Sequence, residues 1–237
     1  MSQWGSLMGC GKWNPRRARS ARRGFLLYSL TMVITYHGGR CFKVTFGDRT
    51  LVFDPISKKS KLTPVKFGAD VAFVSLQHPD SNGIDEVTYG TKVPFVVDCE
   101  GEYEIGDVTA RGYSVKTTYA GTEQYVTIFQ VVLEGINILF LGALGDENLG
   151  TDILSELGDI DVLFVPIGGG DVLGVPQASK LATKLEARCI IPMHYDAAAL
   201  NAFLKEEGST NGKPQEKLTL KKKDLSVMEG EIAVLKS

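Results

Sequence analysis

The sequence predicts an α+β fold in which two β-sheets pack face to face with helices on the outside. Three observations support this. Apolar alternation typical of strands follows Met32, helical periodicity appears only after Asp161, and short β-runs return near the end of the chain. A chain of 237 residues with 43% apolar and 23% charged residues can fill one large core of this kind. One domain over residues 32–237 is therefore expected.

The first strands are predicted to form a meander. Apolar runs cover residues 33–36, 41–46 and 50–54, with turns at His37–Arg40 and Gly47-Asp48, and Pro55 ends the third run. The basic polar loop Lys58–Lys66 leads to a buried strand over Ala69–Ser75. Further strands are expected over residues 94–97, 108–115, 125–133 and 136–141, the last two joined as a hairpin by Glu134-Gly135.

The period then changes from strand to helix. β-runs at 161–166 and 188–192 flank Gln177–Ala187, where Ala178, Leu181, Ala182 and Leu185 fall on one helical face. A second helix, Ala197–Glu207, is predicted to begin after an Asp196 cap and to end at Gly208. Three short strands are expected to finish the chain, over residues 218–220, 225–228 and 232–235.

The first 31 residues differ in charge from the rest. They carry six basic residues and no acid, whereas the remainder has 20 basic and 28 acidic residues, a net charge of −8. An acidic body disfavours nucleic acid as a partner. We expect Met32 to be the natural start and residues 1–31 to be a spurious extension or a disordered arm. Ala21–Leu27 loosely resembles a twin-arginine export signal, so export and nucleic-acid contact by this arm stay as alternatives.

No run of 18 apolar residues occurs, so no membrane-spanning segment is predicted. Four scattered cysteines without a Cys-x-x-Cys pair indicate free thiols, no disulfide and a cytoplasmic location.

Gly168-Gly169-Gly170 lacks the spacing of nucleotide-binding loops, and Cys99 has no histidine nearby in sequence to activate it as a nucleophile. The sequence makes no prediction of oligomeric state.

The segment Ser75–Gly83 follows a buried strand and resembles the metal-binding motif His-x-His-x-Asp-His. His78 and Asp80 keep their places in it, while Leu76 and Ser81 stand where the outer histidines would be. With this motif, five segments in order resemble the metallo-β-lactamase superfamily, and more narrowly its zinc-dependent hydrolases related to ascorbate-6-phosphate lactonase: Ile34–Pro55, Ala69–Gly83, Gly101–Glu104, Leu139–Gly145 and Asp161–Tyr195.

The resemblance implies an αββα sandwich, two mixed sheets with helices outside and metals at the loop edge between the sheets. His78, Asp80 and His194 match family ligand positions, and Asp80 is also the implied catalytic residue. Ala143 replaces a bridging aspartate, and residues 114–121 hold no histidine where another is usual. The expected cofactor is therefore one weakly bound Zn²⁺ or other divalent ion, or none. In the family these three ligands do not share one metal position, so a single site would need rearrangement.

Each of these residues also has a structural alternative. His78 could cap backbone groups, Asp80–Gly83 would form a good turn without a metal, and His194 could line a pocket without ligating. Asp146 and Asp171 lie near the lost aspartate position, either as substitutes or as solvated side chains.

Two functions from different classes follow from these patterns. The first is metal-assisted hydrolysis of an ester, lactone or phosphoester in a small-molecule substrate. The second is a catalytically inactive fold-mate that acts as a binding or interaction module.

Overall fold

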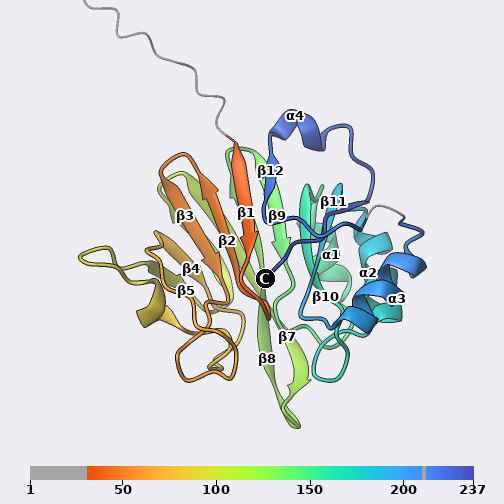
Figure 1. Ribbon diagram of the computed structural model, residues 1–237, viewed down its shortest axis with the longest axis horizontal. Helices are drawn as coiled ribbons and strands as arrows, with labels where there is room; N and C mark the ends of the chain where they lie inside the picture. Colours follow the sequence, from red (N-terminus) through yellow and green to blue (C-terminus); the bar gives the residue numbers. More distant parts are fainter. Residues whose placement is uncertain (1–30, 210–211) are drawn as a thin grey trace, which may run out of the picture.

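The computed structural model describes residues 31–209 and 212–237, which form two mixed β-sheets (Figure 1). The first sheet has the strand order β12-β1-β2-β3-β4-β5. Its strands are β1 (Met32–Tyr36), β2 (Phe42–Phe46), β3 (Arg49–Phe53), β4 (Val71–Phe73), β5 (Phe95–Val97) and β12 (Leu218–Leu220). β3, β4 and β5 run parallel, and the other neighbours are antiparallel.

The second sheet has the order β13-β11-β10-β9-β8-β7-β6. Its strands are β6 (Gly101–Ile105), β7 (Val108–Tyr119), β8 (Thr122–Leu133), β9 (Ile136–Phe140), β10 (Val162–Pro166), β11 (Cys189–Met193) and β13 (Glu231–Ile232). β9, β10, β11 and β13 are parallel, whereas β6 to β9 form an antiparallel meander. Two mixed sheets confirm the predicted α+β class.

The main core lies between the two sheets and is rich in phenylalanine. Phe164 of β10 packs on Phe42 of β2 at a centroid distance of 4.4 Å, and Phe53 of β3 lies 4.9 Å from both Phe73 and Phe140. All five rings have no exposed surface. Strand alternation places these side chains on the inner faces, so the sheets are held together by aromatic packing.

The outer face of the second sheet carries the helices α1 (Thr151–Leu157), α2 (Val175–Leu185) and α3 (Ala197–Glu206). Their apolar residues, such as Leu181 and Phe203, join a second core cluster with Leu163 and Leu139 of the sheet. The outer face of the first sheet is covered by a third cluster from the segment between β3 and β5, which includes the 3₁₀ helix η2 (Ile84–Val87).

Three parts of the sequence prediction need correction. Leu225–Met228 is not a strand: the short helix α4 (Lys222–Leu225) ends at its first residue, and the Asp224 carboxylate caps the start of that helix by accepting the Lys221 N–H at 2.9 Å. α1 and β6 were not predicted. The β7–β8 hairpin is also longer than expected and turns at Ala120-Gly121. Residues 1–30 lie outside the described residues, so the expectations for the N-terminal arm stay predictions.

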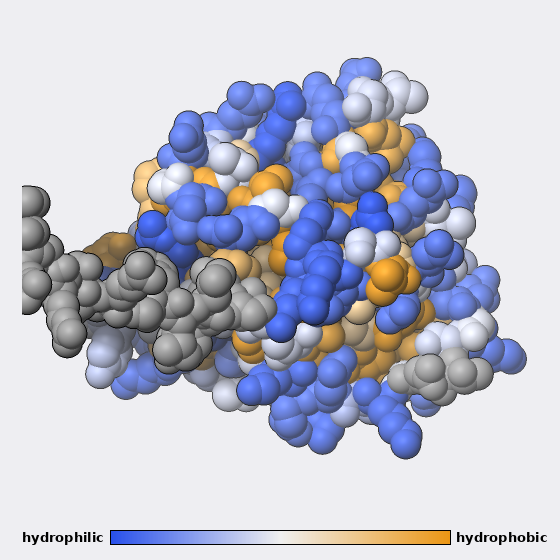
Figure 2. Space-filling view, turned by 90° about the horizontal axis from the view of Figure 1, so that it is seen from above, coloured by the Kyte–Doolittle hydropathy of each residue, from blue (hydrophilic) through white to orange (hydrophobic). Residues whose placement is uncertain are grey.

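The carboxyl ends of β3, β4, β9, β10 and β11 meet at one edge of the sandwich, the lower edge in Figure 1. We call this the loop edge. Seen from above in Figure 2, the opposite edge is mostly hydrophilic, with separate hydrophobic patches. None of the helices in residues 31–209 and 212–237 is long and apolar enough to cross a membrane.

Phe164→Ala should lower the free energy of unfolding by roughly 3–5 kcal/mol, because it opens a cavity at the centre of the aromatic core. Val227→Ala is the control, since Val227 is 78% exposed and its loss should change stability by less than about 0.5 kcal/mol. Urea unfolding followed by circular dichroism measures both. Equal effects of the two substitutions would show that this core is not the main support of the fold.

Candidate functional site

A buried arginine occupies the centre of the loop edge. Arg40 lies in the turn between β1 and β2, and its side chain is only 1% exposed. The guanidinium donates to three side chains: Nε to Asp54 at 3.1 Å, Nη2 to the Ser81 hydroxyl at 2.7 Å, and Nη1 to the Tyr119 hydroxyl at 3.3 Å. Because Tyr119 belongs to the second sheet and Asp54 follows a strand of the first, Arg40 connects the two layers.

Asp54 is the counter-charge and is completely buried. Its carboxylate also accepts the Ser75 N–H and the Ser75 hydroxyl, both at 2.7 Å. Burial acts to lower the pKa of Arg40, but the neighbouring Asp54 carboxylate and Tyr119 hydroxyl outweigh it and hold that pKa above its ordinary value. Burial raises the pKa of the Asp54 carboxyl, while Arg40 and the hydrogen bonds from Ser75 act to lower it. The 3.1 Å contact to Arg40, with every oxygen of the carboxylate bonded, is the geometry of a buried ion pair.

The motif segment Ser75–Gly83 forms a tight turn beside this arginine. The N–H groups of Ser81 and Asn82 both donate to the His78 carbonyl, at 2.8 and 3.0 Å. His78 Nδ1 lies 3.4 Å from the Asp80 carboxylate, which also accepts the Ser60 hydroxyl. The His78 ring meets Tyr119 edge-on at 5.3 Å. The turn that the sequence offered as a structural alternative is therefore present.

His194 follows β11 at the same edge, in a left-handed backbone conformation with φ of 52°. Its N–H donates to the Gly39 carbonyl at 2.8 Å and to the Tyr36 hydroxyl at 3.2 Å. Gly168 packs against it so closely that a Cβ there would collide with the His194 carbonyl oxygen. A strained residue held in this way is a frequent mark of a functional site.

The electrostatic surroundings of His194 link it to the motif. Burial lowers the pKa of its imidazole and the Arg40 cation lowers it further, while the carboxylates of Asp80 and Asp171 act in the opposite direction. His78, Asp80 and His194 thus lie at one edge of the sandwich, around Arg40, which the sequence did not indicate as part of a site. Of the two proposed substitutes, the Asp171 carboxylate acts to raise the pKa of His194.

At three positions where the family resemblance predicts a ligand, the structure has a buried side chain that is neither a histidine nor an aspartate. Leu76 is 4% exposed and Ala143 is fully buried, and both belong to the apolar cluster under the helices. Ser81, also fully buried, is held by Arg40. Gly142, with φ of 55°, is so close to the Ser75 side chain that a Cβ would overlap it. A ligand at these positions would replace apolar contacts or the Arg40–Ser81 hydrogen bond.

The residues present do not fit a divalent metal at this edge. Over residues 31–209 and 212–237, no three or more histidine, cysteine, aspartate or glutamate side chains are grouped so that they could hold an ion. Leu76 and Ala143 offer no ligand atom, and the Arg40 guanidinium lies against Ser81. Metal ligation by His78, Asp80 and His194 stays a prediction that the geometry does not favour.

A groove opens beside His194. It has a volume of about 920 Å³ and runs between Leu62–Phe67 on one side and Tyr195, Leu200 and Leu235 on the other. Tyr36 and Gly39, which accept hydrogen bonds from the His194 N–H, also line it. This volume is within the range of small-molecule sites, and most of the walls are apolar or aromatic.

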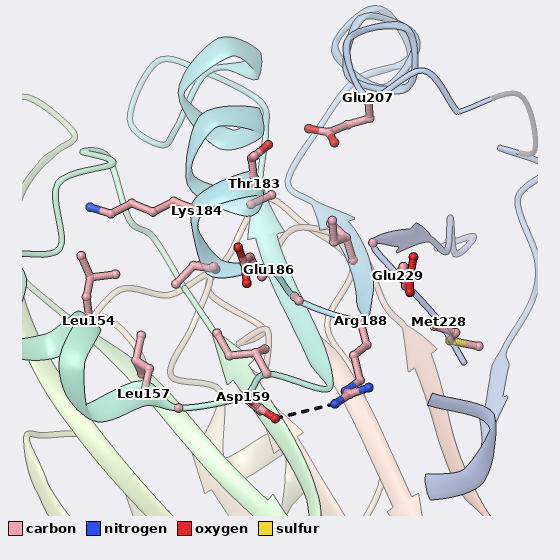
Figure 3. A pocket seen from close by; sticks show the side chains of 17 residues that line it. Leu154, Leu157, Asp159, Thr183, Lys184, Glu186, Arg188, Glu207, Met228 and Glu229 are labelled. Atoms are coloured by element: carbon pink, nitrogen blue, oxygen red, sulfur yellow. Dashed lines mark ion pairs between the residues drawn. The ribbon is translucent and has the colours of Figure 1, made fainter. Parts of the chain in front are cut away.

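A second pocket of about 780 Å³ lies at the opposite edge, between α1, α2 and the Met228–Gly230 turn (Figure 3). Its side chains mix charges of both signs, and Arg188 forms an ion pair with Asp159 at 3.7 Å. It is far from the carboxyl ends of the parallel strands, where open α/β sheets usually bind ligands.

The two mixed sheets, the motif turn and the loop edge define a protein of the metallo-β-lactamase fold. Residues 33–194 match the family described as the "Beta-lactamase superfamily domain", and the chain belongs to this family. The narrower relation to ascorbate-6-phosphate lactonase stays a prediction, as does the cytoplasmic location.

Relatives from several organisms are similar over most of the chain. A UPF0173 metal-dependent hydrolase of Listeria innocua is 25% identical, and the match covers 71% of this chain and 87% of the relative. A crystal structure from Thermotoga maritima, assigned to the Zn-dependent hydrolases of the metallo-β-lactamase superfamily, is 31% identical, covers 86% and 98% of the two chains, and has a TM-score of 0.69. A metallo hydrolase of Ignicoccus hospitalis, at 17% identity over 81% and 99% of the chains with a TM-score of 0.60, shares the fold.

The pKa values of His37 and His194 should both lie below 6.5 in the folded protein, because burial disfavours their charged forms and a cation lies near each, Lys43 and Arg40 respectively. The unfolded chain then takes up protons that the folded chain resists, so stability should fall as the pH drops below about 6.5. NMR titration of the three imidazoles measures the pKa values directly.

Urea unfolding at pH 7.5 and 5.5 tests the linked change in stability, which His37→Gln should reduce. Titration of His37 and His194 at or above the ordinary histidine value would contradict this description of the site.

Proposed function

We propose that this chain is a binding member of its family, which holds a small amphiphilic anion in the groove beside His194 and does not hydrolyse it through a metal. The observation that carries the proposal is a groove of about 920 Å³ whose walls include Tyr195, the neighbour of His194 in the chain. Leu76, Ser81 and Ala143 are buried and offer no ligand geometry for a metal. Binding requires only the groove, whereas metal-assisted hydrolysis also requires a set of metal ligands.

The apolar part of the proposed ligand follows from the walls of the groove. Phe67, Tyr195, Leu200 and Leu235 line it, and Leu62 at its mouth is 37% exposed. Aromatic and aliphatic surfaces of this kind favour a ligand with an apolar body.

The charge of the ligand follows from the loop Lys58–Lys66. This loop has four lysines and no acid, in a chain whose residues after 31 have a net charge of −8. All four lysines are exposed, and none takes part in an ion pair among the described residues. Lys66 lines the groove itself. Asp196 also lines the groove, on the side of Tyr195. A carboxylate, sulfonate or phosphate next to the loop Lys58–Lys66 would meet the positive charge of its lysines.

The fluorescent probe 1-anilinonaphthalene-8-sulfonate tests this, with the neutral N-phenyl-1-naphthylamine as its matched analogue. The anionic probe should bind at one site per chain and more tightly than the neutral one. Lys61→Gln with Lys66→Gln should weaken its binding by roughly threefold to tenfold, an effect that salt reduces, whereas Lys180→Gln on α2 should not. Leu62→Asp should weaken it further by placing a negative charge at the mouth.

Two results would contradict the proposal. Equal affinity for both probes, unchanged in the lysine variants, would exclude an anion site in this groove. Metal-dependent esterase or phosphodiesterase turnover that His78→Ala, Asp80→Asn or His194→Ala abolishes would instead support the hydrolase with one divalent ion held by these three residues and with Asp80 in the catalytic role.

A further inference from the structure

The position of Arg40 raises the question of why a permanent charge is buried at the loop edge. Its three partners lie 14, 41 and 79 residues away in sequence. They come from the end of β3, from the motif turn and from β7 of the opposite sheet. One side chain therefore ties together the three segments that approach each other at this edge.

The charge of Arg40 is compensated only from within the protein. Asp54 has no exposed surface, and its oxygens are bonded to Arg40 and Ser75. The Tyr119 ring adds to this, because the guanidinium carbon lies 5.3 Å from its centroid. An arginine does not lose its proton under ordinary conditions, so the cation is present at every working pH.

The Arg40 guanidinium would repel a metal ion bound nearby. Ser81 Oγ, in the last position of the motif turn, accepts from Arg40 and is fully buried. A divalent ion at this position would lie within a few ångströms of the guanidinium, in surroundings that screen charge weakly. Leu76 and Ala143 offer it no ligand, and both are packed in the apolar cluster.

We propose that the Arg40 guanidinium is the resident cation of the loop edge, in the place where the relatives named as metal-dependent hydrolases would hold an ion. On this view the arginine connects the two sheets and neutralises Asp54, and the chain folds and stays folded without a metal. The inference is independent of the groove, because it concerns metal binding and stability and holds whether or not an anion binds beside His194.

Metal binding gives the first test, with zinc as the probe. The full chain should contain no stoichiometric zinc after purification from zinc-supplemented medium, and neither zinc nor EDTA should shift its melting temperature.

Restoring ligands with Leu76→His, Ser81→His and Ala143→Asp should leave zinc binding weak as long as Arg40 is present. Adding Arg40→Ala to these three changes should raise zinc binding to at least one ion per chain, measured by calorimetry and metal analysis on protein whose fold is checked by circular dichroism.

A stability cycle gives the second test and does not depend on the multiple variant folding. Arg40→Leu should lower the melting temperature by about 10 °C, because it leaves the Asp54 carboxylate buried without its counter-charge. Asp54→Asn in the Arg40→Leu background should restore part of this loss, since the amide oxygen can accept the Ser75 N–H and the amide NH2 can donate to the Ser75 hydroxyl. Arg49→Leu is the control, because its ion pair with Asp107 is exposed.

Three outcomes would overturn the inference. Tight stoichiometric zinc in the unmodified chain would place an ion beside the arginine. Full zinc binding by the triple variant with Arg40 retained would show that the guanidinium does not occupy the position. Additive effects of Arg40→Leu and Asp54→Asn, with no restoration, would show that the two side chains do not act as a pair.

Discussion

Removing a charged group from water is among the most costly steps in folding, and this protein does it twice at one point, with Arg40 and Asp54. The pair is tolerated because each polar atom of the carboxylate finds a donor and the guanidinium finds acceptors in three segments. The arrangement of the loop edge depends on this contact. The turn after β1, the end of β3, the motif turn and the end of β7 all have the positions that let their side chains meet there.

The relation to the family has two parts. The two-sheet fold agrees with the family match, whereas the loop edge at Leu76, Ala143 and Ser81 consists of packed side chains beside a buried arginine. This packing is internally consistent, because Leu76 and Ala143 belong to an apolar cluster and Ser81 accepts a hydrogen bond from Arg40. A stable fold needs only that the edge be filled and its charges paired, and this sequence meets both conditions with ordinary side chains.

The regular elements could be predicted because their signals are local. Alternation identified the strands of the first sheet, and the spacing of Ala178, Leu181 and Leu185 identified α2. The sequence did not predict α1, because its seven residues make about two helical turns, too few to show a periodic apolar pattern. Leu157 is nevertheless buried. Arg40 could not be identified from the sequence, since it stands in a glycine-rich turn where an exposed arginine is the usual interpretation. Its burial depends on partners as far as 79 residues away.

The edges of the two sheets have a consequence for the protein in a crowded solution. β12 and β5 of the first sheet have three residues each, and β13 of the second has two. Such short edges present few free peptide groups to a second chain. The remaining edge strand, β6, is longer, but Glu102 and Glu104 project from it into solvent. Negative charges along an open strand repel an identical strand, so β6 is protected by its charge and β12 and β13 by their shortness, whereas β5 still exposes Phe95 and Val96.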